Sequence, residues 1–473
     1  MRIQFPKINK NSAIFSIFIL SVAIFIFAKL SESQPGNTGS MWPISGDVNI
    51  DGKVDMLDYQ LIYTSFGKSA DQSGYNANAD LNGDNRIDIL DFQILVNNFG
   101  KTAASPTPAQ AMIVTPTATQ APTPTPLPSS LDEDGMWISN SELLSLPTSG
   151  SAWDNMSSTA YGNWGKANLR NQGSDHAINT LAGALVYARK NDASLRSKVR
   201  DGIIAAKQSF DESSEWKTKN GVLASGRQIG AYVIAADLID LENYDDTADN
   251  EFREWLRIIR TTNVGTHGRW KSITYTCENS SGNWSTFACA SRIAASIYLG
   301  DTADVDRSAS IIRAFFGERG FYPEDAPGID GYFEHTGGYQ SSWACNDAAW
   351  TGINPACVKS GINIAGALVE DASRGGRCCT LQGDGIMYSW EALQGLFVST
   401  ELLYRTGNYD DPYDWSDQAL KRAMDHMQRN GWGITKPATY VPWMANARYG
   451  TSYPSPPTAG GRIMSWGDWV YQK

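Results

Sequence analysis

Two copies of one twelve-residue pattern near the N-terminus constrain this chain more than any other feature of its sequence. The first copy spans residues 47–58 and the second spans residues 80–91, an offset of 33 residues. In both, acidic or amide side chains stand at positions 1, 3, 5, 9 and 12. Position 6 is Gly52 in the first copy and Asn85 in the second, and these residue types best tolerate a positive φ. Two copies in one register indicate a duplicated unit, each half built around a sharp turn lined with oxygen atoms.

Oxygen side chains at this spacing form the calcium loop of an EF-hand, in which a hard cation collects carboxylate and carbonyl oxygens around a turn. The sequence therefore predicts two structural Ca²⁺ ions. A solvated acidic turn is the alternative for either copy taken alone. The predicted metal ligands are Asp47, Asn49, Asp51, Asp55, Asp58, Asp80, Asn82, Asp84, Asp88 and Asp91.

An apolar, helical stretch follows each loop, at Tyr59–Phe66 and at Phe92–Phe99, and no matching amphipathic helix precedes either loop. This duplicated loop and helix resembles a dockerin over residues 46–101. The resemblance implies a module that binds two Ca²⁺ ions and docks onto a cohesin-like protein. Residues after loop position 9 often set cohesin choice in that family, and here they are the apolar pairs Met56-Leu57 and Ile89-Leu90. A stand-alone calcium module is the alternative.

The first 30 residues of this 473-residue chain are typical of an export segment. Arg2, Lys7 and Lys10 precede a mostly apolar run from Ala13 to Ala28, which indicates a signal peptide or an uncleaved signal anchor. Either would export the rest of the chain, so we expect a secreted or surface-anchored protein. Extracellular calcium is abundant enough for weak Ca²⁺ sites.

The net charge of −11 argues against nucleic acid as a partner, because nucleic-acid-binding proteins are usually basic. Part of this charge is local, since residues 46–100 contain nine Asp and three Lys or Arg. An acidic chain can still bind an anionic substrate, because the local field in a cleft can oppose the net charge.

The six cysteines all lie between Cys277 and Cys379. In an exported chain they are expected to form disulfides. A local bridge between Cys345 and Cys357 is one candidate, and Cys378 is directly followed by Cys379. A zinc site is the alternative, but no Cys-x-x-Cys pair lies near a histidine.

A Pro/Thr-rich tract at residues 102–130 is predicted to be an extended linker, because its composition cannot bury a core. It separates the small module from a C-terminal domain, residues 131–473. Helical periodicity dominates that domain. We therefore expect an all-α fold of stacked helical hairpins, an incomplete α/α toroid, with a helical repeat scaffold as the alternative. The predicted helices cover His176–Lys190, Leu195–Phe210, Arg227–Leu241, Glu251–Ile259, Trp284–Leu299, Ala303–Phe316, Gly361–Ala372, Trp390–Arg405 and Trp415–Gln428.

Four loop clusters of the C-terminal domain carry the side chains best suited to chemistry, at residues 278–284, 330–340, 370–376 and 385–393. Together they supply an amide, an imidazole, a guanidinium and a phenol. This set suits β-elimination on a uronic acid. Amide, imidazole and guanidinium groups can bind the sugar carboxylate and stabilise the enolate-like intermediate, while a phenol transfers the proton.

One motif is Asn279-x-x-x-x-Trp284 before an Ala-rich helix, and another is Arg374-Gly-Gly followed by Tyr388. With these motifs the domain resembles the alginate lyase superfamily of polysaccharide lyases, which have α/α-toroid folds. The resemblance implies that Asn279 or Asn283, His335 and Arg374 neutralise the carboxylate, and that Tyr388 is the acid, the base or both. It implies no catalytic cofactor. The substrate would be alginate or a related polyuronate.

Two departures from the family pattern are visible. Many such enzymes have histidine directly after the asparagine, whereas Ser280 follows Asn279 and Trp284 follows Asn283 here. The interval from arginine to tyrosine is also lengthened by residues 377–384.

Four further residues are candidates for substrate binding, because aromatic and imidazole rings commonly line sugar clefts. The candidates are Trp284, Tyr332, Tyr339 and His176. Structural roles are the alternative for several of the named residues: Arg374 can pair with Glu370 one helical turn earlier, Tyr388 can be part of the core, and His335 can be a surface residue.

Two other functions remain open. A glycoside hydrolase on the same architecture would need two opposed carboxyl groups. A non-catalytic carbohydrate-binding surface protein would need neither these groups nor the phenol. The candidate acids for a hydrolase are Glu324, Asp325, Asp330, Glu334, Asp347, Asp384 and Glu391.

Overall fold

The computed structural model describes part of the chain in detail. The described residues are 46, 48–49, 53–54, 56–70, 72, 75–82, 85–99, 101, 135–211, 218–263, 271–326, 339–345, 352–430 and 432–472. The chain divides into two compact units, Met1–Ala121 and Pro122–Lys473. The predicted export segment and Pro/Thr-rich linker lie outside the described residues. Within the described ranges, no helix has both the length and the apolar character needed to span a membrane.

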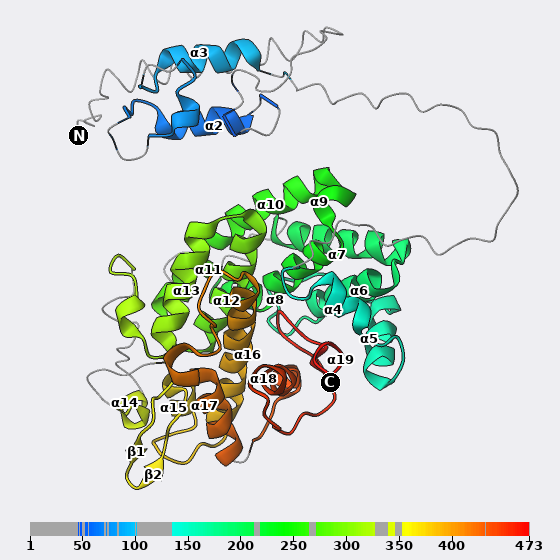
Figure 1. The fold of residues 1–473 in the computed structure, drawn as a ribbon, viewed down its shortest axis with the longest axis vertical. Coiled ribbons are helices and arrows are strands. Elements are labelled where there is room, and N and C mark those ends of the chain that lie inside the picture. Colours follow the sequence, from blue (N-terminus) through cyan, green and yellow to red (C-terminus); the bar gives the residue numbers. More distant parts are fainter. Residues whose placement is uncertain are drawn as a thin grey trace, which may run out of the picture. The chain divides into compact units, whose positions relative to one another are not determined.

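The N-terminal unit repeats one small motif. Its elements are helix α2 (Met56–Ser65), the short 3-10 helix η1 (Ala77–Ala79) and helix α3 (Ile89–Asn98) (Figure 1). The two α-helices are those predicted after the loops. Their rings meet at equivalent positions, with the centroids of Tyr59 and Phe92 5.6 Å apart in an edge-to-face contact. The small core is duplicated in the same way, since the buried residues Ile62 and Leu95 stand at equivalent positions of the two copies.

The C-terminal unit is mostly helical, as predicted. Among the described residues, the only strands are β1 (Val358–Lys359) and β2 (Ile362–Asn363), an antiparallel pair that matches Val358 with Asn363. Its helices are α4 (Asn140–Ser145), α5 (Ser151–Tyr161), α6 (His176–Lys190), α7 (Ala193–Asp211), α8 (Lys219–Leu238), α9 (Leu241–Tyr244), α10 (Asp246–Thr261), α11 (Ile273–Asn279), α12 (Asn283–Leu299), α13 (Thr302–Phe316), η3 (Arg319–Phe321), α14 (Gln340–Trp343), α15 (Val369–Ser373), α16 (Asp384–Arg405), α17 (Trp415–Arg429), η4 (Lys436–Ala438), α18 (Val441–Tyr449) and α19 (Gly467–Val470).

Helix α12 lies between α8 and α16 and packs extensively against both, and α6 packs against the other side of α8 (Figure 1). The C-terminal residues of α8, α12 and α16 line one common cavity. These three packed helices therefore run parallel. The parallel packing is close: a Cβ on Gly395 of α16 would lie 2.4 Å from the backbone carbon of Thr286 in α12. Glycine at this position therefore sets the distance between the two helix axes.

Replacing Gly395 by alanine is therefore expected to lower the free energy of unfolding by about 2–3 kcal/mol, as overpacking does in a rigid core. The added methyl group meets the backbone of α12, which cannot move aside as a flexible side chain would. Denaturant unfolding of the purified protein measures the effect. Gly320→Ala is the matched control, because no atom lies within 4 Å of the position its Cβ would occupy. Equal stability of both variants would contradict this account of the helix contact.

Most predicted helices are present, but the prediction for Gly361–Ala372 is wrong. That stretch contains strand β2 and a turn, and only its end belongs to α15. Ser360, Gly361 and Gly366 all have positive φ, so the backbone cannot continue as a right-handed helix there. The apolar residues of this segment suggested helical spacing, but they belong to a hairpin and a short loop.

All six cysteines form disulfides, which excludes the zinc alternative for these residues. The pairs are Cys277–Cys289, Cys345–Cys357 and Cys378–Cys379. The first bridge links α11 to α12. It lies beside an ionic network in which Glu278 accepts hydrogen bonds from Arg292 and Arg307. The start of α12 is thus fixed by covalent and ionic contacts together.

Candidate functional site

The first residue of α12, Asn283, is held by an acidic residue of α15. Its side-chain Nδ2 donates a 2.7 Å hydrogen bond to Oδ1 of Asp371, and its backbone N–H donates to the same oxygen at 3.2 Å. Both side chains are fully buried. Among the described residues, Asn283 Oδ1 and Asp371 Oδ2 have no hydrogen-bond partner. The pair therefore fixes the orientation of the Asn283 amide.

Burial raises the pKa of Asp371 to about 7, although Arg374 and the hydrogen bond from Asn283 both act to lower it. The ordinary value for such a carboxyl group is 3.8. The folded protein therefore binds a proton here between about pH 4 and pH 7 that the unfolded chain releases. This carboxyl group makes the fold less stable as the pH rises through that interval.

The variant Asp371→Asn cannot ionise, and its Oδ1 can still accept the hydrogen bond from Asn283. We expect its stability relative to the wild type to rise between pH 4 and pH 7, by on the order of 4 kcal/mol, and then to level off. Chemical denaturation at pH 4.5, 6 and 8 measures the difference. Asp201→Asn serves as the control, because that side chain is 64% exposed. A difference that stays constant with pH would be inconsistent with a buried, titrating Asp371.

Glu370, the residue before Asp371, holds Arg374, a second candidate residue. Oε1 of Glu370 accepts a 3.2 Å hydrogen bond from Arg374, and its Oε2 accepts one of 3.0 Å from Gln340 in α14. The alternative role foreseen for Arg374, an ion pair one turn along the helix, is thus present. The Arg374 guanidinium also lies over the ring of Tyr388, 4.7 Å from its centroid. Consecutive acids of α15 therefore hold Asn283 and Arg374, and Arg374 contacts Tyr388.

The contact between Arg374 and Tyr388 depends on how the inserted segment folds. Gly375 and Gly385 approach each other so closely that a Cβ on Gly385 would lie 3.1 Å from the Gly375 nitrogen. The residues between them form a closed loop, and Arg374 and Tyr388 meet across its base. The longer interval in the sequence therefore does not prevent Arg374 and Tyr388 from meeting.

A buried ion pair next to this cluster was not predicted from the sequence. Arg227 of α8 donates from Nη2 to Oε2 of Glu391 at 2.7 Å, and from Nη1 to Gln172 at 3.0 Å. Burial lowers the pKa of Arg227, and the nearby Glu391 carboxylate acts to raise it. Arg462 and Tyr388 are also close enough to influence the pKa of this guanidinium. Glu391 lies three residues after Tyr388, on the same side of α16. Arg227 and Arg462 therefore belong to the surroundings of the candidate site.

Three other predicted residues, Asn279, Trp284 and His176, are wholly or partly buried and are held by other contacts. Asn279, at the end of α11, is buried and donates from Nδ2 to the Tyr275 carbonyl at 3.1 Å. Trp284 is partly buried against the core. His176 begins α6, shares a 2.8 Å hydrogen bond with the Tyr232 hydroxyl, and burial lowers its pKa to about 4. Asn283, rather than Asn279, is thus the asparagine joined to the acids of α15.

Two predicted residues, Tyr332 and His335, lie outside the described residues. Tyr339, directly before α14, is described, and 43% of its surface is exposed. The guanidinium of Arg377 lies 5.2 Å from the centroid of its ring. Tyr339 is therefore an exposed ring covered on one side by a cation.

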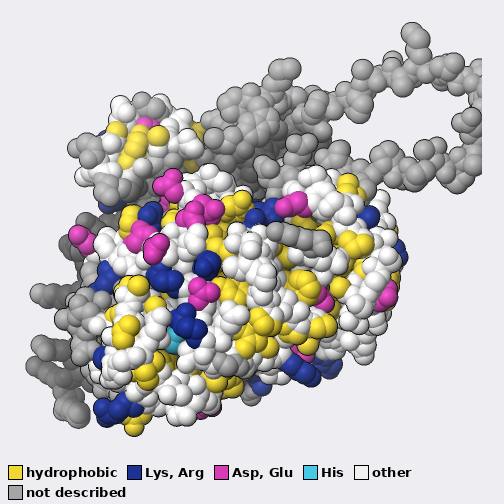
Figure 2. All heavy atoms as spheres, turned by 60° about the horizontal axis from the view of Figure 1, so that its bottom comes forward, with side chains coloured by type: hydrophobic (Ala, Val, Ile, Leu, Met, Phe, Trp, Pro, Cys, Tyr) yellow, Lys and Arg dark blue, Asp and Glu magenta, His cyan; other side chains and the backbone are white. Residues whose placement is uncertain are grey.

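Charged side chains of both signs are interspersed with apolar ones on the face of the C-terminal unit drawn in Figure 2. The net charge of the chain therefore does not prevent arginines from gathering locally, as Arg227, Arg374 and Arg462 do around Tyr388 and Glu391.

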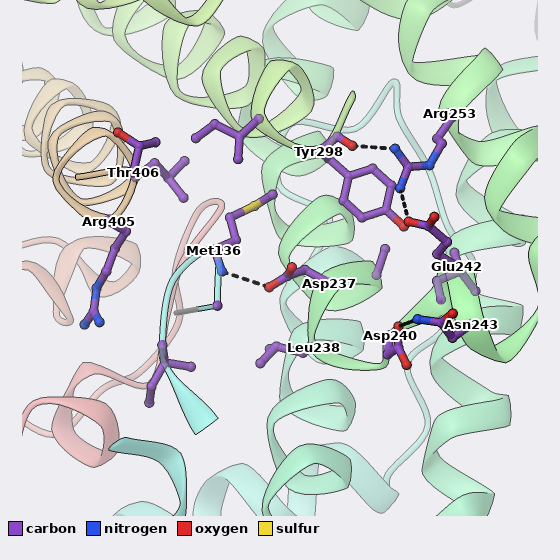
Figure 3. A pocket seen from close by; sticks show the side chains of 16 residues that line it. Met136, Asp237, Leu238, Asp240, Glu242, Asn243, Arg253, Tyr298, Arg405 and Thr406 are labelled. Carbon is purple, nitrogen blue, oxygen red and sulfur yellow. Dashed lines mark hydrogen bonds and ion pairs between the residues drawn. The ribbon is translucent and has the colours of Figure 1, made fainter. Parts of the chain in front are cut away.

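A cavity of about 400 Å³ lies elsewhere, at the C-terminal ends of α8, α12 and α16 (Figure 3). Its charged groups pair with one another or with nearby residues: Arg253 donates to Glu242 at 2.8 Å, and Asp237 accepts the backbone N–H of Met136 at 3.1 Å. Tyr388 and Arg405 are 17 residues apart on α16, so this cavity lies about 25 Å along the helix from the candidate site. None of the predicted residues that the structure describes lines it.

In the N-terminal unit, the two calcium-type loops are closed by the same contacts. Asp58 Oδ1 accepts backbone hydrogen bonds from Val48 and Asn49 at 2.7 and 3.1 Å. Asp91 Oδ1 accepts the equivalent bonds from Leu81 and Asn82 at 2.8 and 3.1 Å. Both carboxyl groups, at loop position 12, are buried. Each is thus held beside the start of its own loop.

The donor set of these loops fits a hard cation, since it consists of oxygen atoms around a turn. Asn85 has the positive φ expected at position 6, with a value of 66°. Among the described residues alone, no group of three or more acidic, histidine or cysteine side chains is arranged to hold a metal ion. The predicted ligands Asp47, Asp51, Asp55 and Asp84 lie outside those residues.

Comparison with known families agrees with this geometry for the N-terminal unit. Residues 45–100 match the family described as Dockerin type I domain. Domains of this type bind calcium and cohesin partners, and proteins that carry them are typically extracellular or associated with the cell surface. No curated protein matches the chain.

Proposed function

We propose that the C-terminal unit is a polysaccharide lyase that cleaves alginate or a related polyuronate by β-elimination. The observation that carries the proposal is the set of contacts around α15. Asp371 holds Asn283, Glu370 holds Arg374, and the Arg374 guanidinium covers the ring of Tyr388. A guanidinium and a phenol thus meet next to the buried amide of Asn283, and a cation beside a phenol suits elimination on a uronate.

In the proposed reaction, Arg374 binds the substrate carboxylate, with His335 as a second group. Their hydrogen bonds strengthen as charge moves onto that carboxylate in the enolate-like intermediate. The fully buried Asn283, whose amide donates to Asp371, holds the start of α12 against α15. Tyr388 takes the proton from C5, the bond between C4 and the glycosidic oxygen breaks, and the proton passes to the departing oxygen. One product carries a new C4–C5 double bond and the other a hydroxyl group, so no net proton is consumed.

Incubating the purified full-length protein, with Ca²⁺, with alginate, polyglucuronate or pectate tests this proposal. An unsaturated uronate absorbs ultraviolet light, so absorbance should rise with one of these polymers and identify it. New reducing ends without that absorbance would show that the enzyme cleaves the polymer by hydrolysis and not by elimination. The absence of both signals, together with no binding to any of the three polymers, would remove polyuronates as substrates.

A glycoside hydrolase is the second candidate, because one carboxyl group near the site has a raised pKa. General acids of glycosidases have this property. Asp371, with a pKa of about 7, is protonated enough to donate near neutral pH. Its side chain is, however, fully buried and occupied by Asn283, which supports a positioning role and favours elimination.

For the rest of the chain, we propose that the dockerin domain binds two Ca²⁺ ions in EF-hand-like loops and docks onto a cohesin-like protein. The identical closing contacts of both loops support two sites. We also propose that the C-terminal helices form an incomplete α/α toroid, for which the parallel arrangement of α8, α12 and α16 is the main support. Secretion or anchoring at the cell surface would place such a lyase on its polymer outside the cell.

A further inference from the structure

The closed loop between Gly375 and Gly385 is anchored to the segment around α14. Trp343 donates from its indole nitrogen to the Gly376 carbonyl at 2.9 Å, and the backbone N–H of Cys378 donates to Ser342 Oγ at 3.1 Å. The disulfide between Cys378 and Cys379 lies within the loop. Contacts at several points therefore fix the loop against α14, and with it the position of Arg377.

Arg377 differs from the other arginines near the candidate site. Arg374, Arg227 and Arg462 each pair with a carboxylate, namely Glu370, Glu391 and Asp175. In the part of the chain that the structure describes, Arg377 forms no ion pair and contacts only the exposed ring of Tyr339. An exposed cation beside an exposed aromatic face is the surface on which an acidic sugar can bind, through its carboxylate and its C–H face.

This pair lies close to the proposed reaction site. Tyr339 precedes Gln340, whose amide is 3.0 Å from Glu370, and Glu370 in turn binds Arg374. Two arginine–tyrosine pairs, Arg374 with Tyr388 and Arg377 with Tyr339, therefore flank the Gln340–Glu370 contact. Helices α14 and α15 lie together at this end of the unit (Figure 1).

We propose that Arg377 and Tyr339 form a second subsite, which binds the uronate next to the one that reacts. The proposal rests on the proposed lyase function and extends it to the substrate class. A polyuronate carries a carboxylate on every ring, so one chain can contact Arg374 and Arg377 at the same time. The substrate is then a polymer of consecutive uronates rather than one with isolated acidic sugars.

The test compares the wild type with Arg377→Gln and Tyr339→Ala, using full-length protein, and Arg257→Gln as a matched control. Arg257 is also an exposed arginine, on α10, and it pairs with Glu254 three residues earlier on the same helix. With the polymer that the wild type cleaves, we expect KM to rise about tenfold in Arg377→Gln with kcat unchanged, the effect of one lost charge-assisted contact. Added salt should reduce this difference, because the site is exposed.

Affinity electrophoresis through gels containing alginate, polyglucuronate or pectate measures binding without turnover. Retardation of the wild type and the control, with loss of retardation in Arg377→Gln, supports the subsite even if no elimination is detected. Elimination by all variants with equal KM and equal retardation would overturn the subsite and leave the lyase proposal standing. A wild type that no gel retards and that cleaves none of the three polymers would overturn both.

Discussion

Tyr388→Phe is expected to lower the kcat of elimination about a thousandfold, the usual contribution of a positioned acid or base. The variant keeps the aromatic ring under the Arg374 guanidinium, and so keeps the packing contact, but it cannot accept or return the C5 proton. KM should change little, because the groups proposed to bind the carboxylate remain. Initial rates of ultraviolet absorbance on the cleaved polyuronate measure the effect.

Tyr404→Phe is a closely matched control for this experiment. Tyr404 lies near the other end of the same helix, α16, and its ring also lies under a guanidinium, that of Arg448 at 4.3 Å from the centroid. This substitution should leave kcat unchanged. If both variants kept wild-type activity, Tyr388 would not be the proton-transfer group. If both lost it, the loss would reflect damage to α16 rather than lost chemistry.

Removal of calcium is expected to unfold the dockerin domain and to leave the C-terminal unit folded. The buried apolar core of the domain is small, with Val48, Val54, Ile62, Ala79, Ile87 and Leu95 fully buried. A core of this size rarely supports a fold without a metal or another constraint. Binding of calcium to the folded form alone therefore supplies much of its stability.

Limited proteolysis with and without a chelator, read by mass spectrometry, should give new cuts within residues 46–101 only when calcium is absent. Calorimetric titration should count two ions in the wild type and one in Asp91→Ala, while Asp201→Ala, in the other unit, should still bind two. Chelation should not change elimination rates. A chelator-resistant domain, or an enzyme that stops with chelator, would contradict this separation of roles.

Local signals in the sequence predicted the helices well because their boundaries are set by neighbouring residues. At the start of α13, for example, the side chain of Asp301 accepts the backbone N–H of Asp304 and caps the helix. The duplicated loops were equally predictable, since the five predicted ligands of each loop lie within twelve consecutive residues. The segment Gly361–Ala372 failed because its turns depend on positive φ at individual residues, which apolar spacing does not reveal.

The surroundings of the candidate site were less predictable, because they depend on contacts between distant residues. Asn283 and Asp371 are 88 residues apart, and Arg227 and Glu391 are 164 apart. Nothing near Arg227 in the sequence distinguishes it from a surface arginine on an amphipathic helix. Arg374 and Tyr388 were proposed from the chemistry of their side chains and from a family resemblance. The residues that hold them, Glu370 and Gln340, required the fold.

The parallel direction of α8, α12 and α16 has an electrostatic consequence. Each helix carries a macrodipole with about half a positive charge at its N-terminus, and dipoles that point the same way add rather than cancel. Helices α12 and α16 begin at Asn283 and Asp384, close to the candidate site. The end of the bundle that holds Arg374 and Tyr388 is therefore more positive than the net charge of the protein suggests. A polyanion approaching this acidic molecule would be drawn toward that end.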